Sequence, residues 1–398
     1  MTRPSAAADF PAVSPPAPPT SHRLDAIDLV RGVVMVVMVL DHVRAYFTEA
    51  RFDPTDLGRT SAALFLTRWV THICAPTFVF LAGTSAWLSG RRRTTAELSR
   101  FLLTRGAWLV LLELTVVSFA WYLNLRFELG AFAQVIWAIG LAMTVLAALV
   151  HLPRAWVAAI GAALVAGHNL LDGITPASLG ASAPLWTALH VQGPLGGLPV
   201  FVVYPLLPWI GVMALGYAAG PLLATPAGRR ERLLGLGAVV TLTFVALRWT
   251  NLYGDPRPWA PQDDAVFTAL AFVNLTKYPP SLLFLLMTLG PMFLLLGAAE
   301  RARGPVARAL VTVGRVPLVF YVAHLYLVHL LAVGAGALAG TDPGKLLTVF
   351  MLFPEDHGFG LPVIYLAWAI VVVALYPLCR WAAALKARHR AAWWVSYV

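Results

Sequence analysis

Long apolar segments alternate with short polar ones along nearly the whole chain. Each apolar segment approaches the roughly 20 helical residues that a bilayer crossing needs, at about 1.5 Å of rise per residue. The pattern therefore predicts an all-α fold, a polytopic transmembrane bundle of about ten spanning helices. The predicted spans are 26–46, 66–88, 106–124, 132–150, 155–171, 201–223, 233–252, 281–299, 316–338 and 361–378.

Composition supports a membrane protein. Of the 398 residues, 59% are hydrophobic and only 12% are charged, whereas soluble domains carry about 25% charged residues. The stretch 1–22 is rich in proline and alanine and has no apolar core, which predicts a disordered tail and not a signal peptide. The transmembrane domain is expected over 23–384, followed by a basic and aromatic cytoplasmic tail at 385–398.

The basic residues indicate membrane topology, and no nucleic-acid partner is expected. The formal charge is +10, but Lys and Arg gather in every second loop, as at 91–93 and 229–232, while the intervening loops are richer in acid. The positive-inside rule then places both termini in the cytoplasm. Membrane lipids are the expected surroundings of the bundle.

Several kinds of chemistry are disfavoured because the sequence lacks their motifs. Cys74 and Cys379 lie far apart in apolar segments, so neither a disulfide framework nor a zinc site is expected. The sequence holds no motif for nucleotide hydrolysis, dinucleotide redox chemistry or zinc proteolysis. We therefore expect no metal and no tightly bound cofactor.

The first predicted span carries ionisable residues at both ends of an apolar run. On a helical wheel Asp28, Arg31, Met35, Met38 and His42 share one face. The first and last of these stand about 21 Å apart along the axis. Charges at the edges of a spanning helix are costly unless they pair or face a wet cavity. The bundle is therefore expected to be organised around this face.

Two blocks near the start of the chain resemble a known family. The first is RLDAIDLVRG (23–32), which is followed by Asp41 and His42, and the second is APTFVFLAGTSAWL (75–88). The first looks like the start of membrane-embedded acyltransferases. The second is similar to the second helix of the heparan-alpha-glucosaminide N-acetyltransferase catalytic domain, and the stretches 274–291 and 314–329 resemble a bacterial branch of that family.

The resemblance implies transfer of an acyl group across a bacterial-type inner membrane. Acetyl-CoA, as a co-substrate, would approach from the cytoplasm, and the acceptor, a sugar or glycan, would lie on the other side. His42 matches the first-helix histidine of the related bacterial sugar O-acyltransferases. The lysosomal enzyme of the family instead has Asn at this position and a histidine in its first lumenal loop, whereas 48–61 here contains no histidine.

His42 is the candidate catalytic residue, because acyl transfer needs a base or a nucleophile and histidine serves as either. The alternative is an interfacial histidine that caps the helix. Asp41 supports the site but points about 100° away on the helix. We therefore expect another carboxylate to orient His42, from Asp53, Asp56 or Glu113.

Arg31 and Asp28 are the candidate donor-binding residues. The planar guanidinium of Arg31 suits a phosphate of acetyl-CoA. The alternative is a structural ion pair between the two side chains, which lie three residues apart on the helix.

The predicted topology places four more candidate residues on the acceptor side of the membrane: His72, Arg248, Lys277 and His324. Lys277 either contacts an anionic acceptor or the oxyanion, or snorkels to the membrane interface. The two histidines either line the substrate cavity or are satisfied by neighbours within the bundle, as by Tyr321 one turn before His324.

Two other classes of function remain open. An acid–histidine stripe in a polytopic bundle also suits a proton-coupled transporter or exporter, and a scaffold subunit for envelope assembly is a further alternative. A homodimer is open as well. A narrow tunnel from Arg31 to His42 would favour acyl transfer, and a closed bundle would argue against both active functions.

Overall fold

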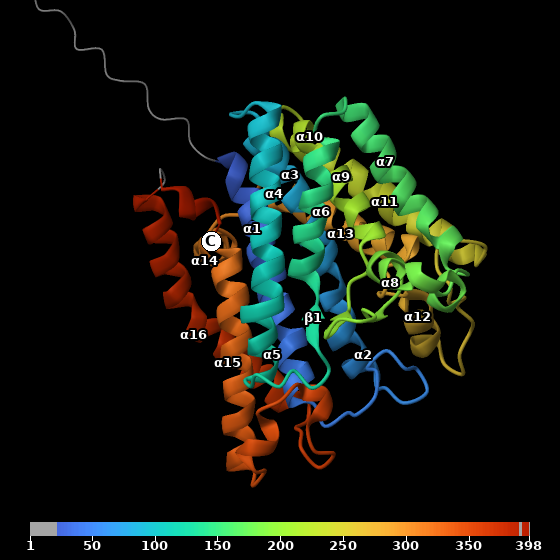
Figure 1. Ribbon diagram of the computed structural model, residues 1–398, viewed down its shortest axis with the longest axis vertical. Coiled ribbons are helices and arrows are strands. Elements are labelled where there is room, and N and C mark those ends of the chain that lie inside the picture. The colour runs from blue at the N-terminus through green and yellow to red at the C-terminus, as the bar shows by residue number, and fades with distance from the viewer. Residues whose placement is uncertain (1–21, 390–391, 398) are drawn as a thin grey trace, which may run out of the picture.

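The long helices run between two ends of one bundle (Figure 1). The computed structural model describes residues 22–389 and 392–397. Helix α1 (His22–Phe47) begins at the upper end in Figure 1, near Arg31, and finishes toward the lower end, near His42. We name these the Arg31 end and the His42 end. The predicted tail at 1–22 lies outside the described residues except for His22, which begins α1.

The remaining elements follow in chain order. The α-helices are α2 (Ala62–Trp69), α3 (Cys74–Gly90), α4 (Thr95–Leu112), α5 (Ser118–Tyr122), α6 (Val135–Leu149), α7 (Arg154–Gly167), α8 (Ala183–His190), α9 (Leu207–Ala218), α10 (Gly220–Ala224), α11 (Arg229–Thr250), α12 (Ala265–Val273), α13 (Leu282–Ala299), α14 (Pro305–Gly314), α15 (Pro317–Leu338) and α16 (Leu361–Arg388). The strands are β1 (Ala131–Ala133), β2 (Gly193–Pro194) and β3 (Val200–Val202).

Seven helical segments are long and apolar enough to cross a membrane. They are Ala62–Gly90, Thr95–Tyr122, Arg154–Leu171, Arg229–Thr250, Leu282–Ala299, Pro317–Leu338 and Leu361–Arg388. Helices α6, α9 and α14 are also apolar but shorter. The prediction of a polytopic helical membrane protein is confirmed, and each predicted span overlaps at least one helix. Helix α16 runs to Arg388, so the predicted tail at 385–398 begins inside a helix.

A small three-stranded sheet departs from the all-α prediction. Strand β1 pairs in parallel with β3, and β2 pairs antiparallel with β3. Gly130 before β1 and Gly197 between β2 and β3 both have φ of +80°, which a residue with a side chain rarely adopts. Strands of two or three residues carry no readable periodicity, so the hydrophobic pattern does not predict this sheet.

Helix α1 is held by close backbone contact. It packs against α3, α13, α14, α15 and α16. A Cβ atom at Gly32 would overlap the backbone carbonyl of Leu310, and one at Gly314 would overlap that of Asp28. Small residues allow membrane helices to approach this closely. The α1–α14 contact therefore fixes the depth of Arg31 in the bundle.

A π-helical turn, Glu113–Val117, lies between α4 and α5. Glu113 is fully buried, and its Oε2 accepts a hydrogen bond of 3.0 Å from the backbone N–H of Trp137 in the first turn of α6. A carboxyl oxygen there accepts from a donor that the helix N-terminus leaves free. The contact fixes the start of α6, where Gln134 and Val135 face two different cavities.

The loop after α1 is fastened to the segment before α16. The Phe359 N–H donates to the Phe47 carbonyl at 2.6 Å. Arg51 donates to the carbonyls of Pro354 and His357 at 2.9 and 2.5 Å. Burial, and then the charge of Arg51, lower the pKa of His357. This fastening therefore holds a neutral imidazole at pH 7 and forms one rim of the His42 end.

Candidate functional site

Two cavities enter the bundle, one lined by Arg31 and one by His42. The first, the Arg31 cavity, has a volume of about 370 Å³, and the second, the His42 cavity, about 700 Å³. Val135 lines the Arg31 cavity and the adjacent Gln134 lines the His42 cavity. Tyr321 lines the first and His42 the second, and their ring centroids are 6.5 Å apart. The two cavities therefore meet at a wall about one side chain thick.

The Arg31 cavity is rich in cations. It is lined by Arg31, Arg93, Arg105, Arg315 and Lys386. Arg31 donates to Asp28 at 3.1 Å and also to Ser85. Asp28, in turn, lies 3.6 Å from the Nε atom of Arg315. The predicted Arg31–Asp28 pair therefore exists, and Arg31 of this pair lines the cavity.

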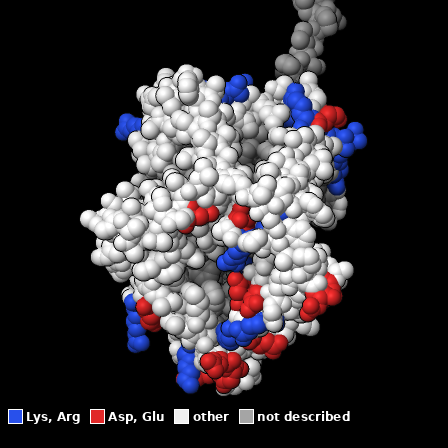
Figure 2. Space-filling view, turned by 90° about the vertical axis from the view of Figure 1, so that its right-hand side faces the viewer, with Lys and Arg blue, Asp and Glu red and all other residues white. Residues whose placement is uncertain are grey.

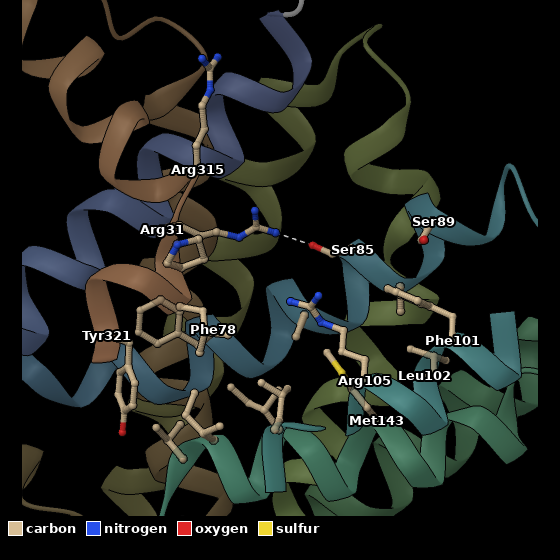
Figure 3. A pocket seen from close by; sticks show the side chains of 18 of the residues that line it. Arg31, Phe78, Ser85, Ser89, Phe101, Leu102, Arg105, Met143, Arg315 and Tyr321 are labelled. Atoms are coloured by element: carbon tan, nitrogen blue, oxygen red, sulfur yellow. Dashed lines mark hydrogen bonds between the residues drawn. The ribbon is translucent and has the colours of Figure 1, made fainter. Parts of the chain in front are cut away.

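Arg105 has no counter-charge within residues 22–389 and 392–397. It makes no hydrogen bond or ion pair with any residue that the structure describes. In Figure 3 the guanidinium groups of Arg31 and Arg105 extend toward the same part of the cavity. A cation inside a membrane bundle is costly without a partner. The arrangement therefore fits an anionic ligand that brings the missing charge.

The rest of the Arg31 cavity lining is mostly apolar. It includes Met35, Phe78, Ala82, Leu102, Leu109, Val135, Ile136, Ile139 and Met143. Tyr321 also belongs to this lining and stands next to the wall toward His42. The cavity thus suits an amphipathic ligand with an anionic head and a thin, mostly uncharged arm.

His42 lies against a second histidine. Its Nδ1 is 2.6 Å from Nε2 of His324, and the two rings stack with centroids 4.9 Å apart. Trp121 packs edge-on against His42 at 5.2 Å. His324 is fully buried, so it contacts the cavity only through His42. The structure therefore places His324 behind His42 and not on the cavity surface.

Asp41 faces two arginines. Its Oδ1 accepts from Arg44 at 3.1 Å, and its Oδ2 accepts from Arg68. All three side chains line the His42 cavity. Arg68 lies within a long apolar span, where a charge by itself signals a functional position, but sequence reasoning did not single it out.

The predicted orienting carboxylates are engaged elsewhere. Asp53 accepts from the backbone of Thr55 at 2.9 Å, and Asp56 accepts from that of Gly58 at 3.0 Å. Glu113 caps α6. Among the described residues, no carboxylate bonds to the His42 ring, so the expectation of such a partner is wrong for this structure, and His324 takes that place.

Lys277 stands beside the cavity rim. Its Nζ lies 5.3 Å from the ring centroid of Tyr278, which lines the His42 cavity. Burial opposes ionisation of Tyr278, but the charges of Lys277 and then Arg68 outweigh it and lower the pKa of this phenol. The rim is therefore a positively charged environment for whatever enters.

Two predicted acceptor-side residues lie apart from the cavities. His72 is buried with its ring 5.3 Å from that of Phe284 and is not a lining residue of either cavity. Arg248 is 2% exposed and donates to four backbone carbonyls, those of residues 257, 271, 272 and 274. Arg248 thus caps the carboxyl end of α12.

A family model matches the chain, but no curated protein does. Within the described residues no group of three or more His, Cys, Asp or Glu side chains is arranged to hold a metal ion. The family model for heparan-alpha-glucosaminide N-acetyltransferase, catalytic, matches residues 23–250, more than half of the chain. That match covers Arg31, His42, Arg68 and Arg105, and the chain therefore belongs to the family of the heparan-alpha-glucosaminide N-acetyltransferase catalytic domain.

Proposed function

We propose that this membrane acetyltransferase moves an acetyl or other small acyl group from cytoplasmic acetyl-CoA to a sugar or glycan on the opposite side. Family membership supports the reaction class. The observation that carries the finer proposal is Arg105, which has no counter-charge among the described residues and stands beside Arg31 in a cavity that ends one side chain from His42. One ligand that combines anionic groups with a long thin arm ending in a thioester is acetyl-CoA.

The donor enters through the Arg31 cavity. Arg31 and Arg105 bind phosphate oxygens, for which the planar guanidinium is suited. The pantetheine arm lies along the apolar lining toward Tyr321. A cavity of about 370 Å³ takes this arm and leaves the nucleotide at the rim, near Arg93 and Arg315.

The acceptor enters through the His42 cavity. His42 takes the proton from the acceptor amine or hydroxyl as its nitrogen or oxygen attacks the thioester carbonyl. The tetrahedral intermediate collapses, the carbon–sulfur bond breaks, and the CoA thiolate receives the proton from His42. Arg44 and Arg68 supply positive potential in the cavity, partly balanced by Asp41.

The Arg31 end faces the cytoplasm of a bacterial-type inner membrane. The chain crosses ten times in this proposal, with α1, α6 and the combined α9–α10 segment added to the seven long apolar segments. On the face shown in Figure 2, the upper end carries mainly Lys and Arg, whereas most Asp and Glu lie in the lower half. The positive-inside rule supports this orientation.

Transport without group transfer is the competing proposal. Two cavities separated by a wall also occur in alternating-access transporters. There one site is exposed to each side in turn, so both entrances serve the same ligand. Here one cavity has a cationic rim with an apolar interior, and the other is lined by side chains of both charges and by His42, with His324 behind it. This difference favours two substrates that meet at the wall.

The direct test is acetyl-CoA turnover by the purified protein in nanodiscs, with glucosamine as the probe acceptor. We expect CoA release that depends on both the protein and the acceptor. Binding of acetyl-CoA is measured in parallel by calorimetry. A wild-type protein that binds no acetyl-CoA at millimolar concentration would overturn the proposal and leave the transporter.

A further inference from the structure

A continuous row of hydrogen-bonding atoms ends at His42. The Phe320 carbonyl lies 3.1 Å from Nδ1 of His324. The Nε2 atom of His324 lies 2.6 Å from Nδ1 of His42. The Nε2 atom of His42 has no hydrogen-bond partner among the residues described, and His42 lines the cavity. The row therefore has a fixed end at the backbone and a free end at the site.

The fixed end determines where the protons are. A carbonyl oxygen only accepts, so the His324 nitrogen that faces Phe320 carries the proton. In neutral imidazole the second nitrogen is then an acceptor. The Nε2 atom of His324 thus accepts from Nδ1–H of His42, and the remaining nitrogen of His42 keeps its lone pair. That tautomer is the one in which Nε2 is a base.

The surroundings of His324 favour the neutral ring. The side chain is 0% exposed, and none of the ion pairs found within 22–389 includes it. A buried charge without a counter-charge is strongly unfavourable. Phe320 stacks on the ring at 5.8 Å and Tyr321 meets it edge-on at 5.5 Å, so packing also restrains its rotation.

We infer that His324 is a positioning residue that holds His42 in the Nδ1–H tautomer and keeps its Nε2 free to accept the proton of the acceptor. This inference rests on the proposed function, since it assigns His42 the role of base. It differs from the acceptor-side role that the sequence suggests for His324. An imidazole oriented through its second nitrogen is the usual second-layer arrangement of catalytic histidines, with a histidine here in place of a carboxylate.

The tautomer is measurable without any turnover. Protein labelled with ¹⁵N-histidine in nanodiscs gives separate ¹⁵N resonances for protonated and unprotonated ring nitrogens, and the His42 signals are those lost in His42→Ala. At pH 7.5 we expect a protonated Nδ1 and an unprotonated Nε2 for His42. The opposite tautomer in the wild-type protein would overturn the inference, whatever the enzyme transfers.

Two substitutions separate positioning from packing. His324→Leu removes the acceptor, and we expect kcat to fall by about 100-fold with an almost unchanged KM for acetyl-CoA. His324→Gln offers a side-chain carbonyl oxygen to the same Nδ1–H, and we expect it to recover at least about tenfold of that loss. The exposed His151, substituted to leucine, is the control histidine.

The outcomes distinguish this inference from the proposed function. If the wild type releases no CoA, the proposed function fails, and the tautomer measurement still decides the His42–His324 arrangement. If the wild type is active and His324→Leu keeps full kcat, the positioning role fails by itself. Equal losses in His324→Leu and His324→Gln, with both variants folded, would likewise contradict it.

Discussion

Replacement of His42 by alanine is expected to lower kcat for acetyl transfer by about 1,000-fold and to leave acetyl-CoA affinity nearly unchanged. A positioned base contributes roughly 10²- to 10⁴-fold to such reactions. His42 lines only the second cavity, whereas the proposed phosphate ligands Arg31 and Arg105 line the first. The chemical step and donor binding therefore depend on different ends of the bundle.

The measurement is CoA release in nanodiscs at saturating acetyl-CoA, beside calorimetric binding of acetyl-CoA. His151→Ala provides the matched control, because this exposed histidine lies in the turn after α6, away from both cavities. Turnover by His42→Ala within tenfold of the wild type would remove His42 from the chemistry. Loss of acetyl-CoA binding in a folded His42→Ala protein would contradict the separation of the two cavities.

Replacement of Arg105 by alanine is expected to weaken acetyl-CoA binding by about 10- to 100-fold. A hydrogen bond between charged partners contributes about 1.5 to 3 kcal/mol, and each 1.4 kcal/mol is tenfold in affinity. Arg105 has no ion-pair partner among the described residues, so its removal leaves none of their charges without a partner. We expect kcat at saturation to change little, because the thioester still reaches His42.

Arg100→Ala is the control on the same helix, since Arg100 is exposed and does not line the cavity. Arg105→Lys keeps the charge but loses the fork of donors, so an intermediate affinity is expected. 3′-Dephospho-CoA and pantetheine test whether the effect comes from phosphate groups. The difference in affinity between wild type and Arg105→Ala should be smaller for 3′-dephospho-CoA than for acetyl-CoA, and smaller still for pantetheine. Equal acetyl-CoA affinity of wild type and Arg105→Ala would contradict the donor site.

The helices and the chemistry of α1 follow from the hydrophobic pattern. Apolar runs of bilayer length mark the long helices directly, and the predicted face of α1 has Arg31 and Met35 in the first cavity and His42 in the second. The Arg31–Asp28 pair follows from helical spacing. Features local to one helix are therefore readable from the sequence.

Contacts between distant segments are not readable in the same way. His42 and His324 are 282 residues apart, and nothing in either helix specifies that their rings meet. Arg248 is a second example, because its position near a span end suggested a substrate contact, and nothing in the sequence shows that its guanidinium donates to backbone carbonyls. Which partner a polar side chain finds depends on how the helices pack, and apolar residues facing lipid or protein look alike in sequence.

The central claim is that the acyl group passes from one cavity to the other across the wall at His42. Sealed proteoliposomes test it, with acetyl-CoA added outside, ¹³C-glucosamine trapped inside and unlabelled glucosamine outside. Only protein molecules whose Arg31 end faces outward meet the donor, so a mixed orientation does not blur the result. We predict N-acetyl-¹³C-glucosamine inside and free CoA outside. Acetylation of the outside, unlabelled glucosamine alone would contradict the account, because donor and acceptor would then share one side.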